Sequence, residues 1–319
     1  MVILFKGTKK SKNLSPQALA LAAGLSATKF LKKTLIIQVT TKYPVEELVM
    51  GKRIANEAIK DAMHLFEDTG MDSLTRRVGV TSFTKDHFSN AIIPSVKSEN
   101  LLDILSVSKK SEADIKREII NNPAIIGSVI KFADNIYDNI FVLANGKDED
   151  VISAISPFVD KTVSCVSQGL KEEIIASKDD YFLVTDFDYR STFSSYYMKK
   201  LYGKRTFFMP YNVEFKEAYL DKNMIQYILH NHTLEKSDYS YHLIDEMTKL
   251  TKALILEDEA VEEDLRFTIK TVERFTSKPN MVSGKDVEIS LTEKKAFKKP
   301  KKMISLKDTP SFKKEGVRA

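Results

Sequence analysis

The chain is poor in the features that mark a secreted or membrane-spanning protein. Its 319 residues include a single cysteine, Cys165, so no intramolecular disulfide can form and a reducing compartment is indicated. No apolar run approaches the roughly 18 residues needed to span a bilayer. The first residues lack the charged and apolar regions of a signal peptide. We therefore expect a cytoplasmic protein, with peripheral association at the inner membrane surface as an additional expectation.

Positive charge is concentrated at one end of the chain. The net charge is +5, but residues 291–319 alone carry ten Lys or Arg and three Asp or Glu, so the remainder is nearly neutral. We predict an α/β domain over 1–256, a helical extension or linker over 257–290 and a basic disordered tail over 291–319. Six lysines of the tail form a candidate surface for anionic membrane or nucleic acid, with a merely solubilising end as the alternative: Lys294, Lys295, Lys298, Lys299, Lys301 and Lys302.

The pattern of apolar runs predicts an α/β fold. Residues 2–7 read as a buried strand, 16–31 as a helix and 34–39 as a second strand. Further short apolar runs alternate with helical segments at 139–144, 162–166, 181–185 and 205–209. Helices are expected at 44–69, 112–134 (one helix, or two broken at Pro123), 148–158, 171–176, 191–202 and 241–275. Residues 78–96 and 100–108 are read as short extended segments. Strands that alternate with helices predict a parallel sheet covered by helices on both faces.

The loop between the first strand and the first helix lacks the residues of a phosphate site. Nucleotide-binding α/β proteins begin with this strand-loop-helix-strand unit. Phosphate binding there uses glycines, whose N–H groups close around the anion, and a lysine for charge. No glycine follows Gly7 in this loop. The pattern therefore favours the fold and disfavours its usual reaction.

The opening segment resembles the ParA/MinD family of deviant P-loop ATPases, including degenerate members linked to pilus, secretion or conjugation systems. Residues 22–26 (Ala-Ala-Gly-Leu-Ser) resemble the family's first helix, which places residues 9–15 on its phosphate loop. The resemblance implies a P-loop NTPase fold, a three-layer sandwich. It puts Lys9 on the family's signature lysine, Ser15 on its magnesium-binding hydroxyl residue, and Leu14 where the catalytic loop has lysine. We take Lys9, Lys12 and Ser15 as a vestigial phosphate loop.

Acidic residues of the family are also missing. Gln38 and Thr40/Thr41 stand where the resemblance expects aspartates after the second strand, and Ala144 and Asn145 where it expects an acid that supports magnesium. Without these groups the charge of a phosphoryl-transfer transition state is not stabilised. Residues 209–212 (Met-Pro-Tyr-Asn) resemble the family segment that passes near the nucleotide base.

Three other motifs each have a structural alternative. Asp186 and Asp188 flank one residue, as in metal-dependent glycosyltransferases, but a turn is favoured. His230 and His232 could bind a metal, yet no third ligand is evident. Five tyrosines could stack on nucleic acid only if they share a face; packing is favoured: Tyr189, Tyr196, Tyr197, Tyr202 and Tyr211.

The resemblance implies a non-catalytic localisation or scaffolding protein of a bacterial transfer, pilus or secretion apparatus, with protein partners from that complex. No cofactor and no catalytic or metal-binding residue is expected in this interpretation, and a homodimer is compatible with it. Two alternatives remain open: an active ATPase with an atypical P-loop, which would bind ATP and Mg²⁺, and a partition-like factor that binds DNA.

Overall fold

The computed structural model describes residues 1–8, 15–39, 84–94, 101–106, 112–169, 181–203 and 205–256, together with positions 45, 49, 70, 71, 73 and 74. The chain divides into two compact units, Met1–Thr268 and Ile269–Ala319, and all described residues belong to the first. Within this described part, no helix is both long and apolar enough to cross a membrane.

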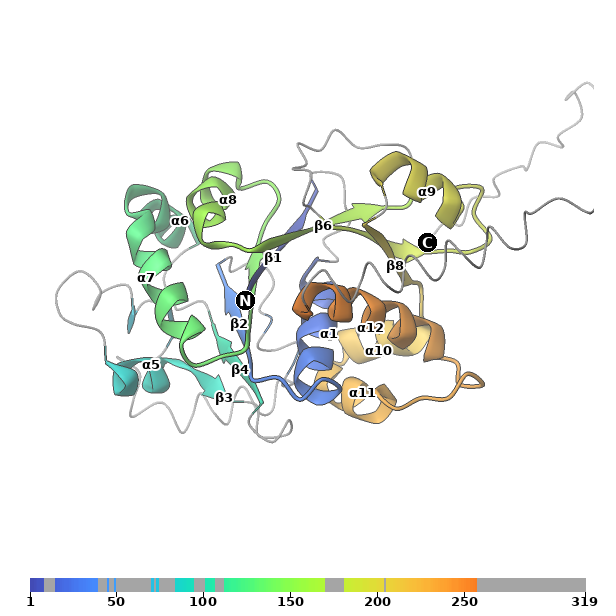
Figure 1. The fold of residues 1–319 in the computed structure, drawn as a ribbon, viewed down its shortest axis with the longest axis horizontal. Helices are drawn as coiled ribbons and strands as arrows, with labels where there is room; N and C mark the ends of the chain where they lie inside the picture. Colours follow the sequence, from blue (N-terminus) through green and yellow to red (C-terminus); the bar gives the residue numbers. More distant parts are fainter. Residues whose placement is uncertain are drawn as a thin grey trace, which may run out of the picture. The chain divides into compact units, whose positions relative to one another are not determined.

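The centre of the first unit is an eight-stranded sheet (Figure 1) with the order β3-β4-β2-β5-β1-β6-β7-β8. The strands are β1 (Val2–Gly7), β2 (Thr34–Gln38), β3 (Ile93–Pro94), β4 (Leu102–Leu105), β5 (Asn139–Ala144), β6 (Lys161–Ser167), β7 (Tyr181–Phe187) and β8 (Thr206–Pro210). All neighbouring pairs are parallel except β3 with β4, where the two-residue strand β3 forms an antiparallel edge. Strands β2 and β5 are buried along their whole length and β1 over its first four residues, because helices cover both faces.

The helices form one layer on each face of the sheet (Figure 1). One layer contains α1 (Ser15–Thr28), α10 (Val213–Leu220), α11 (Met224–Asn231) and α12 (Tyr241–Ile255). The other contains α5 (Lys85–Ala91), α6 (Glu112–Asn121), α7 (Pro123–Asp134), α8 (Glu149–Ile155) with the 3₁₀ turn Ser156–Phe158, and α9 (Ser195–Tyr202). This three-layer α/β sandwich confirms the predicted fold class.

Helix α1 is buried on all sides, from Ser15 to Ala27. Its many small residues allow this, because they let the sheet on one side and α11 and α12 on the other approach closely. At Gly24 the backbone lies directly against the side chain of Ile228. The end of α1 is tied to the sheet by a buried polar pair, in which the Ser26 and Thr34 hydroxyls lie 2.9 Å apart and Asn139 Nδ2 donates to Ser26 Oγ at 3.1 Å.

The elements differ from the sequence expectation at a few places. The extended interpretation of residues 78–96 is wrong at 85–91, which form α5. There the Thr84 hydroxyl caps the helix by accepting the His87 N–H, and Phe88 and Ala91 bury one face. Pro123 separates α6 from α7 and begins the second helix, as the two-helix alternative predicted. Helices α10 and α11 were not anticipated. The predicted helix at 171–176 and most of that at 44–69 lie outside the described residues.

Candidate functional site at the carboxyl edge of the sheet

The carboxyl ends of β1 and β5 form the natural candidate site. The two strands are neighbours, and the helices that follow them lie on opposite faces: α1 after β1 on one, α8 after β5 on the other. In open α/β sheets, ligands bind in the crevice that such a reversal creates at the carboxyl edge. The residues around this crevice therefore decide what the edge can do.

The backbone of the turn after β5 lies against the end of β1. Gly146, in the turn after β5, lies so close to the end of β1 that a Cβ atom there would overlap the Gly7 carbonyl group. Beyond Gly7 the chain still follows the sheet, since Thr8 N donates to Cys165 O at 3.2 Å. The start of the loop after β1 is thus held by β6 on one side and by the Gly146 turn on the other.

Ser15 is the one predicted loop residue that the structure describes. It is the first residue of α1 and is buried, with Pro16 behind it and no acidic residue in the first turn. Gln17, in the same turn, is also buried, and its Oε1 atom has no hydrogen-bond partner among the described residues. Lys9 and Lys12 lie outside the described residues, as do the six tail lysines Lys294, Lys295, Lys298, Lys299, Lys301 and Lys302.

The two amides that replace expected acids both have structural roles. Gln38 is buried at the end of β2, and its Oε1 accepts the Val45 N–H at 3.0 Å, which ties the following segment to the sheet. Asn145 shapes the turn after β5: its Oδ1 accepts the Lys147 N–H at 3.2 Å, and its carbonyl accepts the Asp148 N–H at 2.9 Å. Each side-chain oxygen thus accepts a hydrogen bond from the backbone.

Sequence reasoning missed one acid at this edge. Asp148 follows the same turn, is mostly buried and forms an ion pair with Lys116 of α6 at 2.8 Å. Its second oxygen, Oδ2, is buried and has no hydrogen-bond partner in the part of the chain that the structure describes. The sequence could have suggested Asp148, because it lies three residues after Asn145. Nothing in the sequence indicated that Lys116 lies beside Asp148. With this lysine as counter-charge, Asp148 serves to hold α6 against the β5–α8 turn.

Asp186 belongs to the end of β7, and Asp188 begins the turn that follows the strand, in which Ser191 N donates to Asp188 O at 3.1 Å. Asp188 binds Arg190 through both carboxylate oxygens at 3.0 Å, and its Oδ1 also accepts the Arg190 N–H at 2.9 Å. These bonds with Arg190 lower the pKa of the Asp188 carboxyl. Gln168 fixes the turn from β6 by bonding both the N–H and the carbonyl of Asp188. Across the described part of the chain, no group of three His, Cys, Asp or Glu side chains could hold a metal ion.

The remaining candidates are divided between core and surface. Tyr202 stacks on Phe182 of the core, with ring centroids 5.1 Å apart, and Tyr197 packs on Phe193. Tyr189, Tyr196 and Tyr211 are exposed, but they lie on separate segments. Cys165 is fully buried in β6, and burial raises its thiol pKa to about 12, so it is a core residue and not a nucleophile.

The segment after β8 builds a junction between helices. Asn212 caps α10, since its Oδ1 accepts the Phe215 N–H at 2.8 Å. Its Nδ2 donates to Ser240 Oγ at 3.2 Å, and Ser240 in turn donates to Glu214 Oε2 at 2.6 Å. This buried chain of hydrogen bonds links the end of β8 to the starts of α10 and α12. The sequence indicated the Asn212 segment but gave no sign of Ser240.

Comparison with known proteins identifies the fold. No protein-family model and no curated protein sequence matches the chain. Among solved structures, a ParA family ATPase from Chlorobium tepidum TLS superposes with a TM-score of 0.56 at 14% identity, over 79% of this chain and 98% of that one. MinD in the MinC:MinD cell division complex of Aquifex aeolicus gives 0.55 at 11%, over 80% and 96%. Septum site-determining MinD with Mg-ADP from Pyrococcus horikoshii OT3 gives 0.53 at 13%, over 80% and 96%. The chain therefore has a ParA/MinD-like P-loop NTPase fold.

Proposed function

We propose that this chain is a non-catalytic localisation or scaffolding protein of a bacterial transfer, pilus or secretion apparatus, built on a ParA/MinD-like fold with a degenerate nucleotide site. The observation that carries the proposal is the hydrogen bonding of the Gln38 and Asn145 side chains. Both stand where the resemblance expects acids, and both use their side-chain oxygens to hold backbone N–H groups.

The physical argument concerns charge. Phosphoryl transfer is catalysed mainly by positioning and by cations that neutralise the transferred phosphate, above all Mg²⁺ held by carboxylates. A neutral amide is a weak ligand for Mg²⁺, and here each amide oxygen is already engaged. The nearby acid, Asp148, is paired with Lys116. The described residues of this edge thus offer Mg²⁺ no uncommitted carboxylate cluster.

We propose that partners bind to the surface of the folded domain and to the tail. The MinD relative described above was solved with MinC, and by analogy we propose protein partners and a nucleotide-independent homodimer for this chain. For the tail, we propose that residues 291–319 bind anionic surfaces. The end of α12 is held by the sheet and not by the tail, because Lys161 Nζ of β6 donates to Ala253 O at 3.1 Å and to Leu256 O at 3.3 Å.

An ATPase assay tests the proposal. The purified full chain is expected to show no Mg²⁺-dependent ATP hydrolysis above a no-enzyme blank, and its oligomeric state by light scattering should be the same with and without ATP. Lys9→Ala serves as the matched variant and should change nothing. Turnover that Lys9→Ala abolishes would overturn the proposal, as would a monomer that dimerises only with ATP.

One observation favours the alternative of a functional nucleotide site. Helix α1 begins at Ser15, and its first turn carries no acid, so the helix N-terminus keeps the positive partial charge that attracts phosphate. If nucleotide binds, ATP with Mg²⁺ should raise the melting temperature of the wild-type chain and should do so less for Ser15→Ala. Equal shifts in both proteins would exclude Ser15 from nucleotide binding. DNA binding through the tail, the third possibility, is tested with the tail deletion below.

A further inference from the structure

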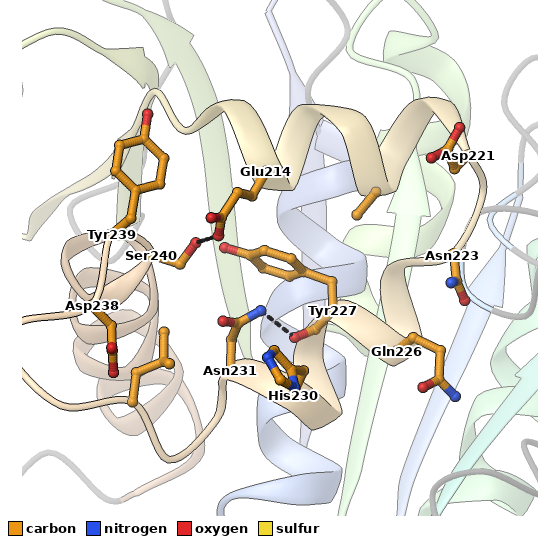
Figure 2. A pocket seen from close by; sticks show the side chains of 12 residues that line it. Glu214, Asp221, Asn223, Gln226, Tyr227, His230, Asn231, Asp238, Tyr239 and Ser240 are labelled. Atoms are coloured by element: carbon orange, nitrogen blue, oxygen red, sulfur yellow. Dashed lines mark hydrogen bonds between the residues drawn. The ribbon is translucent and has the colours of Figure 1, made fainter.

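A cavity of about 650 Å³ lies between α10, α11 and the turn that leads into α12. Figure 2 shows α10 along one side of it, α11 beneath, and the turn with Asp238 and Tyr239 at the far end. Its volume is in the range of sites that hold small ligands. None of the twelve residues that line it is Lys or Arg.

The floor of the cavity is preformed by buried polar residues. Tyr227, Asn231 and Ser240 are 7%, 6% and 1% exposed. Asn231 Nδ2 donates to the Tyr227 carbonyl at 2.8 Å, and Ser240 donates to Glu214 Oε2 at 2.6 Å (Figure 2). These bonds fix the floor, so a ligand would bind without first paying to order it.

The Tyr227 hydroxyl is the unsatisfied group of this floor. It is buried beside Glu214 and Ser240, yet it has no hydrogen-bond partner in the described part of the chain. Burial raises the pKa of Tyr227 to about 12; the neighbouring Ser240 hydroxyl opposes this shift and the negative charge of Glu214 adds to it, so the phenol stays neutral. A buried polar atom left unpaired destabilises the folded state. A ligand N–H group that reached its oxygen would remove that destabilisation.

Three carboxylates surround the cavity from different directions. Glu214 lies at the start of α10, Asp221 just beyond its end, and Asp238 on the turn opposite (Figure 2). Glu214 and Asp221 are seven residues apart, which corresponds to about 10 Å along a helix. Carboxylates this far apart cannot converge on one metal ion, whose ligands lie within about 2.6 Å of it. Tyr239, 61% exposed at the rim, adds an aromatic face suited to a cation.

We infer that this cavity binds a linear organic polycation, whose ammonium groups meet the separated carboxylates while its methylene chain lies against Tyr227 and Tyr239. The same chemistry is offered by a free polyamine and by neighbouring lysine side chains of a partner protein. The site lies on α10 to α12 and needs neither nucleotide nor the tail, so it holds whether or not the proposed function is correct.

The test is titration calorimetry of the full chain with spermidine, with a trilysine peptide, and with Mg²⁺ at matched ionic strength. We expect at least one of the two polycations to bind and Mg²⁺ not to compete. The double variant Glu214→Gln/Asp238→Asn should weaken binding about tenfold, if each exposed charge contributes roughly 0.5–1 kcal/mol. The amides keep the shapes of the acids and can still accept the bonds from Ser240 and from the Glu235 N–H.

Glu217→Gln is the matched control. Glu217 lies on the same helix, is exposed and does not line the cavity, so its replacement should leave the affinity unchanged. If the double variant melts early, Asp221→Asn gives a second variant, since the Asp221 side chain accepts no hydrogen bond from the described residues. Preference for spermidine or for the peptide identifies the source of the polycation. Failure of both spermidine and trilysine to bind would overturn the inference. An equal loss of affinity in Glu217→Gln would also overturn it, since diffuse surface charge would then explain the binding.

Discussion

The close approach of Gly146 to β1 makes a sharp prediction for Gly146→Ala. The added Cβ would overlap the Gly7 carbonyl and lie 3.3 Å from Thr8 N. These neighbours are backbone atoms, so no side chain can rotate away. The turn and the strand must separate instead, which strains the last β1–β5 pair, Lys6 with Ala144, and the bond from Thr8 N to Cys165 O.

The expected cost follows from these losses. Two backbone hydrogen bonds at about 1 kcal/mol each, plus about 1–3 kcal/mol for overpacking, give roughly 3–5 kcal/mol of lost unfolding free energy. That is a large part of the 5–15 kcal/mol typical of a domain. Urea denaturation followed by circular dichroism measures it.

A matched control separates this steric cost from ordinary backbone strain. Gly203 has a φ of 98° and open space around it, so Gly203→Ala should cost only about 1–2 kcal/mol. If Gly146→Ala is as stable as the wild type or no worse than Gly203→Ala, the turn after β5 does not lie against the end of β1, and the steric reasoning is refuted.

Three further predictions concern other parts of the molecule. Leu31 is 71% exposed and has a φ of 52°, so Leu31→Gly should raise the unfolding free energy by about 1 kcal/mol; a lower melting temperature would contradict this. Burial raises the pKa of Asp103, although its bond from Tyr137 OH and the charge of Lys33 oppose the shift. Because the folded state holds this proton more tightly than the unfolded state, protonated Asp103 contributes fully to stability below the unfolded pKa of about 4, and this contribution is lost as pH rises through the folded pKa. Asp103→Asn should therefore flatten the dependence of unfolding free energy on pH in that window. An unchanged pH dependence would exclude Asp103 as its cause. Deletion of 291–319 should leave the melting temperature unchanged and abolish salt-sensitive retention on anionic liposomes, heparin or DNA; retention equal to that of the full chain would place the anionic-surface site on the first unit.

Local pattern was sufficient for most of the central sheet. The apolar runs that form β1, β2, β5, β6, β7 and β8 were all predicted, because a strand buried on both faces needs an unbroken apolar stretch. The short helix α5 was misread, since its seven residues contain only two buried apolar positions and Thr84 gave the main signal. Helix α10 has a weak pattern, since Phe215 is its one buried residue, whereas α11 carries five buried residues whose helical spacing was the available signal.

The sequence by itself determined the α/β class, the lack of glycine after Gly7 and of lysine at position 14, and the lack of the expected acids after β2 and β5, because these depend on residue identity and on patterns within one segment. Tertiary structure alone decided that Gln38 and Asn145 hold backbone N–H groups, that Asp148 is paired with Lys116, and that Gly146 closes against Gly7. It also brought together the carboxylates of α10 and the turn before α12. These contacts join positions that parallel crossovers carry to a common edge or layer, and no local pattern records which distant backbone will meet a given side chain.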